Sequence, residues 1–78
     1  MSYEFMLVTL EEHSFIKQVS LTTEAGEEIL KRQNGESAKM LYIRTLDQLS
    51  VKGWNLVSTN IYQNDVGFQL YAHLKKEV

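Results

Sequence analysis

The fold is decided by one stretch of the chain, residues 46–58, which reads LDQLSVKGWNLVS. Leu46 and Leu49 stand at helical spacing, and Gly53 follows where a helix commonly ends in a left-handed residue. In such a helix stop, the residue after the glycine packs back onto the last turn, so we expect Trp54 to touch Leu49. The stretch therefore predicts a helix that ends sharply and a strand that begins directly after it.

The helix that ends at this stop is predicted to begin near Ser37. A serine hydroxyl at that position can accept a hydrogen bond from a backbone amide of the first helical turn. The apolar residues that follow recur at helical spacing, which predicts one stripe that packs against a core. The residues of this stripe are Tyr42, Ile43, Leu46 and Leu49.

Four segments have the composition and alternation of strands: residues 3–10, 15–22, 54–62 and 67–75. The first is apolar on both of its alternating faces, and the second is predicted to pair antiparallel to it. Asn, Asp and Gly residues between the last two segments supply the chemistry of a turn. In the last segment one face is clearly the core face, and its residues are Phe68, Leu70, Ala72 and Leu74.

Residues 23–36 allow two interpretations. Acidic residues stand four positions before basic ones, at Glu27 and Lys31 for example, which favours a short helix or turn by a few tenths of a kcal/mol per pair. The pair Asn34 and Gly35 is also a strong signal for a hairpin turn. We expect a short helix or turn here, with a small additional hairpin as the alternative.

Together these elements predict an α+β fold with the order β-β-α-β-β. An antiparallel four-stranded sheet with one main helix packed on one face buries the apolar stripes of both layers. A chain of 78 residues forms one domain, residues 1–78, and buries only roughly 60% of the surface of its unfolded form. The sequence contains no cysteine, which excludes disulfides and thiolate sites, so we expect self-association to supply additional stability.

The charge balance also limits the classes of partner. Eight basic residues stand against ten acidic ones, and the resulting net charge of −2 argues against a nucleic-acid surface. No apolar run reaches the length that spans a bilayer, and the start of the chain lacks the features of a secretory signal. The expected location is therefore the cytoplasm.

Two parts of the sequence resemble a family of small bacterial domains of unknown function. That family opens with Tyr-x-Tyr/Phe, as this chain does at Tyr3 and Phe5, and carries a Gly-Trp-Glu-Leu-Val-Ser block. The block matches residues 53–58 except at Asn55, where the family has Glu. The resemblance covers roughly residues 3–10 and 42–76. It implies an α+β domain and carries no assigned activity.

Candidate catalytic and metal-binding residues are few. His13 and His73 have no ligand-like spacing between them, and we interpret both as solvated or partly packed. The neighbouring carboxylates of residues 11–12 and 27–28 are typical of solvated turns and helix starts. We therefore predict no catalytic site, no cofactor and no metal, and interpret Leu49, Gly53 and Trp54 as structural.

The strongest functional signal is a surplus of apolar residues on the strands. One helix covers one face of a sheet, and both alternating faces of these strands are apolar. One set contains Phe5, Leu7, Phe15, Val19, Phe68 and Leu70, and the opposite set contains Met6, Val8, Leu10, Ile16, Val57, Ile61 and Tyr71. We expect the second set to form an interface, although a one-residue shift in register would exchange the two sets.

This surplus predicts a non-enzymatic interaction or assembly domain that forms a homo-oligomer, with a dimer favoured, or binds a protein partner. The first alternative is a small-ligand-binding protein or enzyme with a pocket between sheet and helix or between subunits. The residues that would line such a pocket are Tyr3, Tyr42, Tyr62, Tyr71, His73 and Arg44. The second alternative is nucleic-acid binding by the sheet, which requires Tyr71 exposed beside Lys17 and Lys75.

Overall fold

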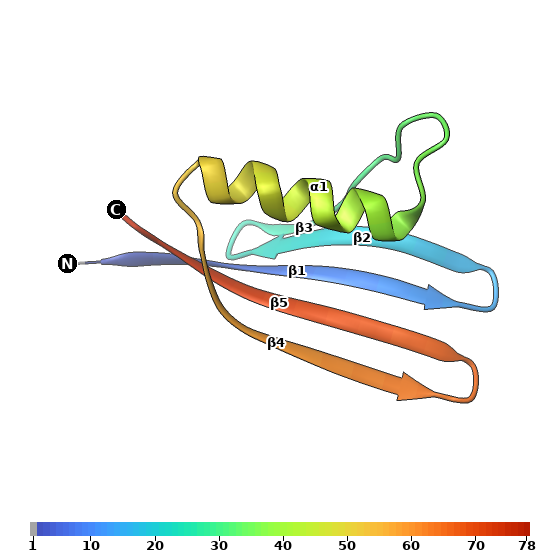
Figure 1. The fold of residues 1–78 in the computed structure, drawn as a ribbon. Helices are drawn as coiled ribbons and strands as arrows, with labels where there is room; N and C mark the ends of the chain where they lie inside the picture. Colours follow the sequence, from blue (N-terminus) through green and yellow to red (C-terminus); the bar gives the residue numbers. More distant parts are fainter. Residues whose placement is uncertain (1) are drawn as a thin grey trace.

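An antiparallel five-stranded sheet carries one helix on one face in the computed structural model, which describes residues 2–78 (Figure 1). The elements in chain order are β1 (Tyr3–His13), β2 (Ile16–Thr23), β3 (Gly26–Ile29), α1 (Ala38–Val51), β4 (Asn55–Asn64) and β5 (Gly67–Glu77). The order across the sheet is β3-β2-β1-β5-β4, so β1 and β5 pair at the centre while β3 and β4 form the edges. The predicted α+β class, the antiparallel sheet and the pairing of the first two strands are confirmed.

The prediction of four strands is wrong, because residues 23–36 contain β3 in place of the expected short helix. The alternative of an additional hairpin is correct, but its turn lies at Glu24 and Ala25, with Thr23 paired to Gly26. Asn34 and Gly35 instead lie in the loop that leads to α1. Side-chain pairs four residues apart contribute only tenths of a kcal/mol, which is too little to outweigh backbone pairing with β2.

The predicted start and end of the helix are confirmed. The Ser37 hydroxyl accepts a hydrogen bond of 3.1 Å from the Met40 amide. At the other end Gly53 has a φ of 95°, a left-handed conformation that glycine adopts without strain. The Gly53 amide donates to the Ser50 carbonyl and the Trp54 amide to the Leu49 carbonyl, at 3.1 and 3.0 Å. These two bonds complete the predicted stop and bring Trp54 back to Leu49.

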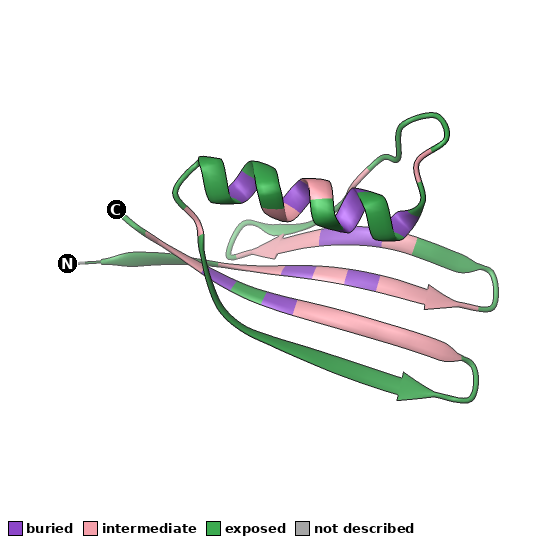
Figure 2. Cartoon of the chain, in the orientation of Figure 1, coloured by how far each residue is buried: buried purple, intermediate pink, exposed green. Residues whose placement is uncertain are grey.

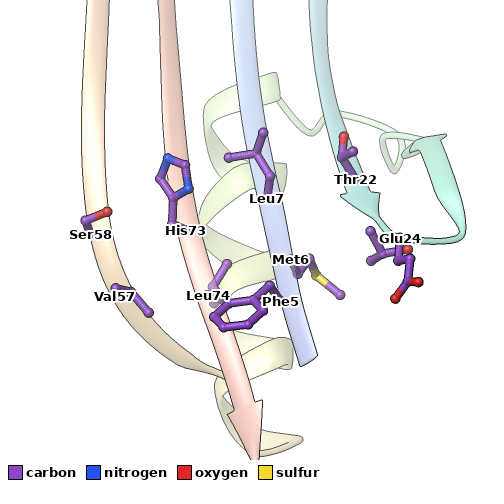
Figure 3. Close-up of a pocket in the computed structure, with 10 residues that line it drawn as sticks. Phe5, Met6, Leu7, Thr22, Glu24, Val57, Ser58, His73 and Leu74 are labelled. Carbon is purple, nitrogen blue, oxygen red and sulfur yellow. The ribbon is translucent and has the colours of Figure 1, made fainter. Parts of the chain in front are cut away.

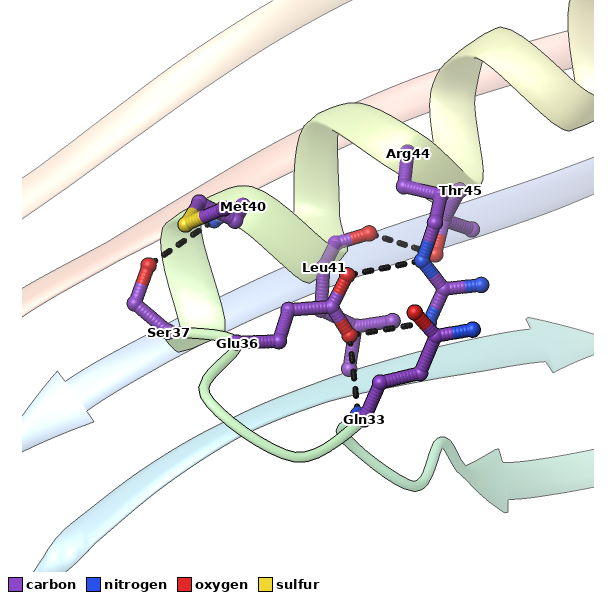
Figure 4. A network of polar contacts seen from close by, with 7 residues as sticks. All are labelled: Gln33, Glu36, Ser37, Met40, Leu41, Arg44 and Thr45. Atoms are coloured by element: carbon purple, nitrogen blue, oxygen red, sulfur yellow. Dashed lines mark hydrogen bonds and ion pairs between the residues drawn. The ribbon is translucent and has the colours of Figure 1, made fainter.

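The loop before α1 is fastened by an ion pair that the sequence analysis did not identify (Figure 4). Arg44 donates from Nε and Nη2 to the two carboxylate oxygens of Glu36, at 2.7 and 2.9 Å. The Gln33 amide donates to the same carboxylate at 3.0 Å. The hydrogen bonds from Arg44, followed by the one from Gln33, lower the pKa of Glu36 from 4.5 to about 2.

The core lies between α1 and the middle of the sheet (Figure 2). Its members are Val8, Leu10, Val19, Ala38, Leu41, Tyr42, Leu49, Ala72 and Leu74. The predicted core face of β5 is confirmed by Ala72 and Leu74, which are 0% and 3% exposed. The predicted helix stripe is correct except at Ile43, which is 60% exposed, while Leu41 is buried in its place.

The expected faces of β1 are exchanged. Val8 pairs with Leu21 on one side and Ala72 on the other, all on the face that meets α1. Phe5 and Leu7 therefore lie on the opposite face, which we call the open face. Because both alternating sets in residues 3–10 are apolar, the sequence pattern does not distinguish the two registers.

Candidate interaction surface

The helix covers only half of the sheet. It packs mainly on β1 and β2, while β4 lies at the far edge (Figure 1). All ten residues of β4 are exposed, and none belongs to the core of the described chain (Figure 2). Leu56 and Ile61 pair with Leu74 and Leu70, which places them on the helix side of the sheet, yet they are 57% and 64% exposed. Phe68 and Leu70 of β5, beside them, are half-buried and pack against the core. We call the region formed by the exposed Leu56 and Ile61, together with these two half-buried neighbours, the uncovered shelf.

The backbone of β4 is also free along its outer side. Within the described residues β4 pairs only with β5, so its other side presents N–H and C=O groups that have no strand partner. Its sequence, NLVSTNIYQN, contains no charged residue and no proline. Natural edge strands usually carry such residues, because a long, uncharged edge is a template for pairing with another chain. β4 has the properties of an edge that pairs.

A β-bulge interrupts β4 near its start. Leu56 pairs with Leu74 and Ser58 with His73, so Val57 is an additional residue that has no partner opposite it. From Ser58 to Asn64 the pairing with β5 is regular. The bulge divides β4 into a short irregular start and a regular stretch, residues 58–64.

The open face is polar at its centre. The Gln69 amide nitrogen donates to Glu11 at 2.7 Å, and the Tyr71 hydroxyl donates to the Gln69 amide oxygen at 2.7 Å. His13 Nε2 lies 3.2 Å from the other carboxylate oxygen of Glu11. This chain of side chains satisfies its own hydrogen bonds, so the open face is not the continuous apolar patch that the sequence predicted.

A hollow of about 460 Å³ lies at one end of the open face (Figure 3). Leu7 and Phe5 of β1, His73 of β5 and Val57 and Ser58 of β4 line it. A volume of this size falls within the range of small-molecule sites, but the hollow is shallow and mostly apolar. A second hollow of about 270 Å³ lies at the opposite end and contacts His13 and Tyr62.

The residues of the predicted interface are dispersed by the true register. Val8 and Leu10 are 0% and 1% exposed beneath α1, so these two do not belong to an exposed surface. Met6 is half-buried and packs against the core. Ile16, Val57 and Ile61 remain exposed. Tyr71 is partly buried and bonded to Gln69.

The six side chains predicted to line a ligand pocket do not converge. His73 lines the larger hollow and Tyr62 the smaller one, at opposite ends of the open face. Tyr42 belongs to the core, where burial raises its pKa, and Arg44 is bonded to Glu36. Within residues 2–78 no three His, Cys, Asp or Glu side chains gather in a way that could hold a metal ion.

The arrangement expected of a nucleic-acid surface is present only in part. Lys75 lies on the open face, with its Nζ 4.8 Å from the centroid of the Tyr3 ring. Lys17 pairs with Glu12 on the helix side of the sheet, so it does not lie beside Tyr71. No helix in the described part of the chain is long and apolar enough to span a membrane.

Comparisons with protein families, with curated proteins and with solved structures each found no match. The sequence pattern identified Ile61 as an interface residue but not other residues of β4, such as Leu56 and Asn60. The signal that could have identified them is the absence of charge over residues 55–64.

Proposed function

We propose that this protein is a non-enzymatic assembly domain that forms a homodimer through β4 and the adjoining uncovered shelf. The observation that carries the proposal is a ten-residue edge strand that is exposed along its whole length and carries neither charge nor proline. An added strand would satisfy the free backbone groups of β4 and cover its apolar side chains.

A second copy of the chain is the partner that fits this edge best. Two copies of an uncharged strand meet without like-charge repulsion, whereas the other edge, β3, carries Glu27 and Glu28 on four residues. Pairing of β4 with the same strand of another copy is isologous, so assembly closes at two subunits. Pairing of β4 with β3 would be heterologous, and heterologous contacts that do not close a ring produce filaments.

The uncovered shelf enlarges the contact beyond the edge itself. A standard protein interface uses about 20–30 residues on each side, and β4 supplies ten. Leu56 and Ile61 project from β4 on the helix side, directly beside this edge. Full burial of a side chain of this size contributes roughly 1.5–3 kcal/mol, so a few such residues matter for dimer stability.

The proposal is tested by placing one positive charge on each edge in turn. Ile61→Lys introduces a lysine into β4, where we expect at least a tenfold increase in the dimer dissociation constant, since the charge loses water on pairing. Ile29→Lys is the matched control, because Ile29 is 57% exposed on the opposite edge. The measurement is sedimentation equilibrium, with circular dichroism to confirm that both variants are folded.

The two variants distinguish a dimer contact through β4 from one through β3. We expect Ile29→Lys to retain the dissociation constant of the unmodified protein. Equal effects at both positions, or a dimer that tolerates Ile61→Lys, would exclude β4 as the contact.

A further inference from the structure

We infer that two copies of this chain pair through β4 in an antiparallel register whose two-fold axis passes Ile61. The inference rests on the proposed dimer and adds its geometry. Antiparallel pairing of one strand with itself requires a two-fold axis perpendicular to the sheet, so the α1 helices of both copies lie on the same side. The result is one continuous sheet made of the strands of both copies.

The register follows from the bulge at Val57. A bulge disrupts the ladder and bends its strand, which limits regular pairing to residues 58–64. The turn at Asp65 and Val66 ends this stretch on its other side. A stretch of seven residues pairs with itself completely only about its middle residue, and the middle residue is Ile61.

Neighbouring registers leave fewer of residues 58–64 in regular pairs. If the axis passed Asn60, Gln63 would stand opposite the bulged Val57. If the axis passed Tyr62, Ser58 would stand opposite Val66 in the turn. Either change removes regular partners from both ends of the ladder. A register shifted by a single residue is worse, because it sets residues of opposite faces against each other.

The side chains fit the central register on both faces. Ile61 meets Ile61 of the second copy on the helix side, which places the apolar residue of highest exposure on β4's helix face at the axis. On the open face Asn60 stands opposite Tyr62 of the second copy. The two Tyr62 rings then lie diagonally across the axis, within the roughly 7–8 Å over which aromatic side chains interact across strands. Tyr62 is 64% exposed in the single chain.

Cysteine cross-linking tests this register directly, because the natural sequence contains no cysteine. Residues that face each other in an antiparallel pair have Cα atoms about 4.5–5.5 Å apart, within the range of a disulfide. Single variants Thr59→Cys, Asn60→Cys, Ile61→Cys and Tyr62→Cys are purified reduced, oxidised with copper phenanthroline and analysed on non-reducing gels. Ile29→Cys on β3 is the control for collisions between exposed thiols.

We expect Ile61→Cys to form the disulfide-linked dimer at least tenfold faster than Ile29→Cys. Thr59→Cys should stay near the control rate, because two copies of Thr59 lie ~14 Å apart along the strands in this register. A mixture of Thr59→Cys with Gln63→Cys should restore rapid cross-linking, since these residues face each other. Cross-linking between Thr59→Cys and Gln63→Cys is the result most specific to this register.

The outcomes distinguish the register from the dimer itself. Rapid cross-linking of Asn60→Cys or Tyr62→Cys in place of Ile61→Cys overturns the register and moves the axis to that residue. A dimer by sedimentation that cross-links at none of these positions overturns the pairing of β4. A protein that sediments as a monomer defeats the proposed function, whatever the gels show.

Discussion

The two edges of the sheet differ in length, charge and exposure. β3 has four residues, and two of them are the glutamates Glu27 and Glu28. β4 has ten residues, no charge, and apolar side chains on both of its faces. Short, charged strands resist pairing with other chains, whereas long, uncharged ones promote it. One edge of this sheet is therefore protected against pairing, and the other is available for it.

The same difference extends to the two halves of the sheet. The half near β2 supplies buried residues such as Val19 and lies under α1, whose loop is fastened by Glu36 and Arg44. The other half ends in β4, which supplies no core residue in the described chain. We therefore assign the stability of the single chain to the covered half and propose that the uncovered half is where two copies associate.

The two halves should differ most in how much free energy of unfolding is lost when a valine side chain is shortened to alanine. Val8→Ala removes two carbon atoms from a fully buried side chain and should lower the free energy of unfolding by about 1.5–3 kcal/mol. Val57→Ala makes the same change at a residue that is 55% exposed, and should cost less than about 0.5 kcal/mol. Urea denaturation of dilute protein, below the dissociation constant of the dimer, measures both values.

This pair of variants also tests the register of β1, because the sequence pattern alone predicts Val8 and Val57 on the same surface. Similar losses for the two variants would mean that β4 contributes to the core of the single chain. The division of the sheet into two halves would then be wrong.

A smaller effect on stability is expected from the Glu36 carboxylate of the covered half, and this effect should be lost in acid. The folded-state pKa of Glu36 is lowered to about 2 from 4.5, so its stabilising effect is complete above pH 4.5 and disappears as the pH falls towards 2. Glu36→Gln should therefore lower the melting temperature at pH 7, and the difference from the unmodified protein should shrink steadily below pH 4.5. Thermal denaturation across this range measures the effect.

Glu24→Gln is the control for this experiment, because Glu24 is exposed in the turn between β2 and β3. A difference between Glu36→Gln and the unmodified protein that stays constant from pH 7 to pH 2 would contradict the role given to the carboxylate.

The sequence was sufficient for those parts of the fold that local chemistry determines. Ser37, Gly53 and Trp54 act within one helical turn, so their residue types indicated where α1 begins and ends. The core face of β5 was also predictable, since Ala72 and Leu74 alternate with polar neighbours.

The features that depend on pairing between distant segments were not predictable. Both alternating sets of β1 are apolar, so only its partners determine that Val8 faces the helix. β3 forms because β2 offers a free edge, in spite of side-chain pairs that favour a helix locally. The bulge at Val57 has no signal in the sequence that we identified, and it separates Val57 from the face of Ile61.

We claim that β4 of one copy is covered by β4 of another, and the mass of the unmodified protein in solution decides between this and an isolated chain. Sedimentation equilibrium over a range from low to high micromolar concentration should show a rise from the chain mass of 9.1 kDa to twice that value, with no larger species. A mass that remains at 9.1 kDa throughout this range would contradict the claim.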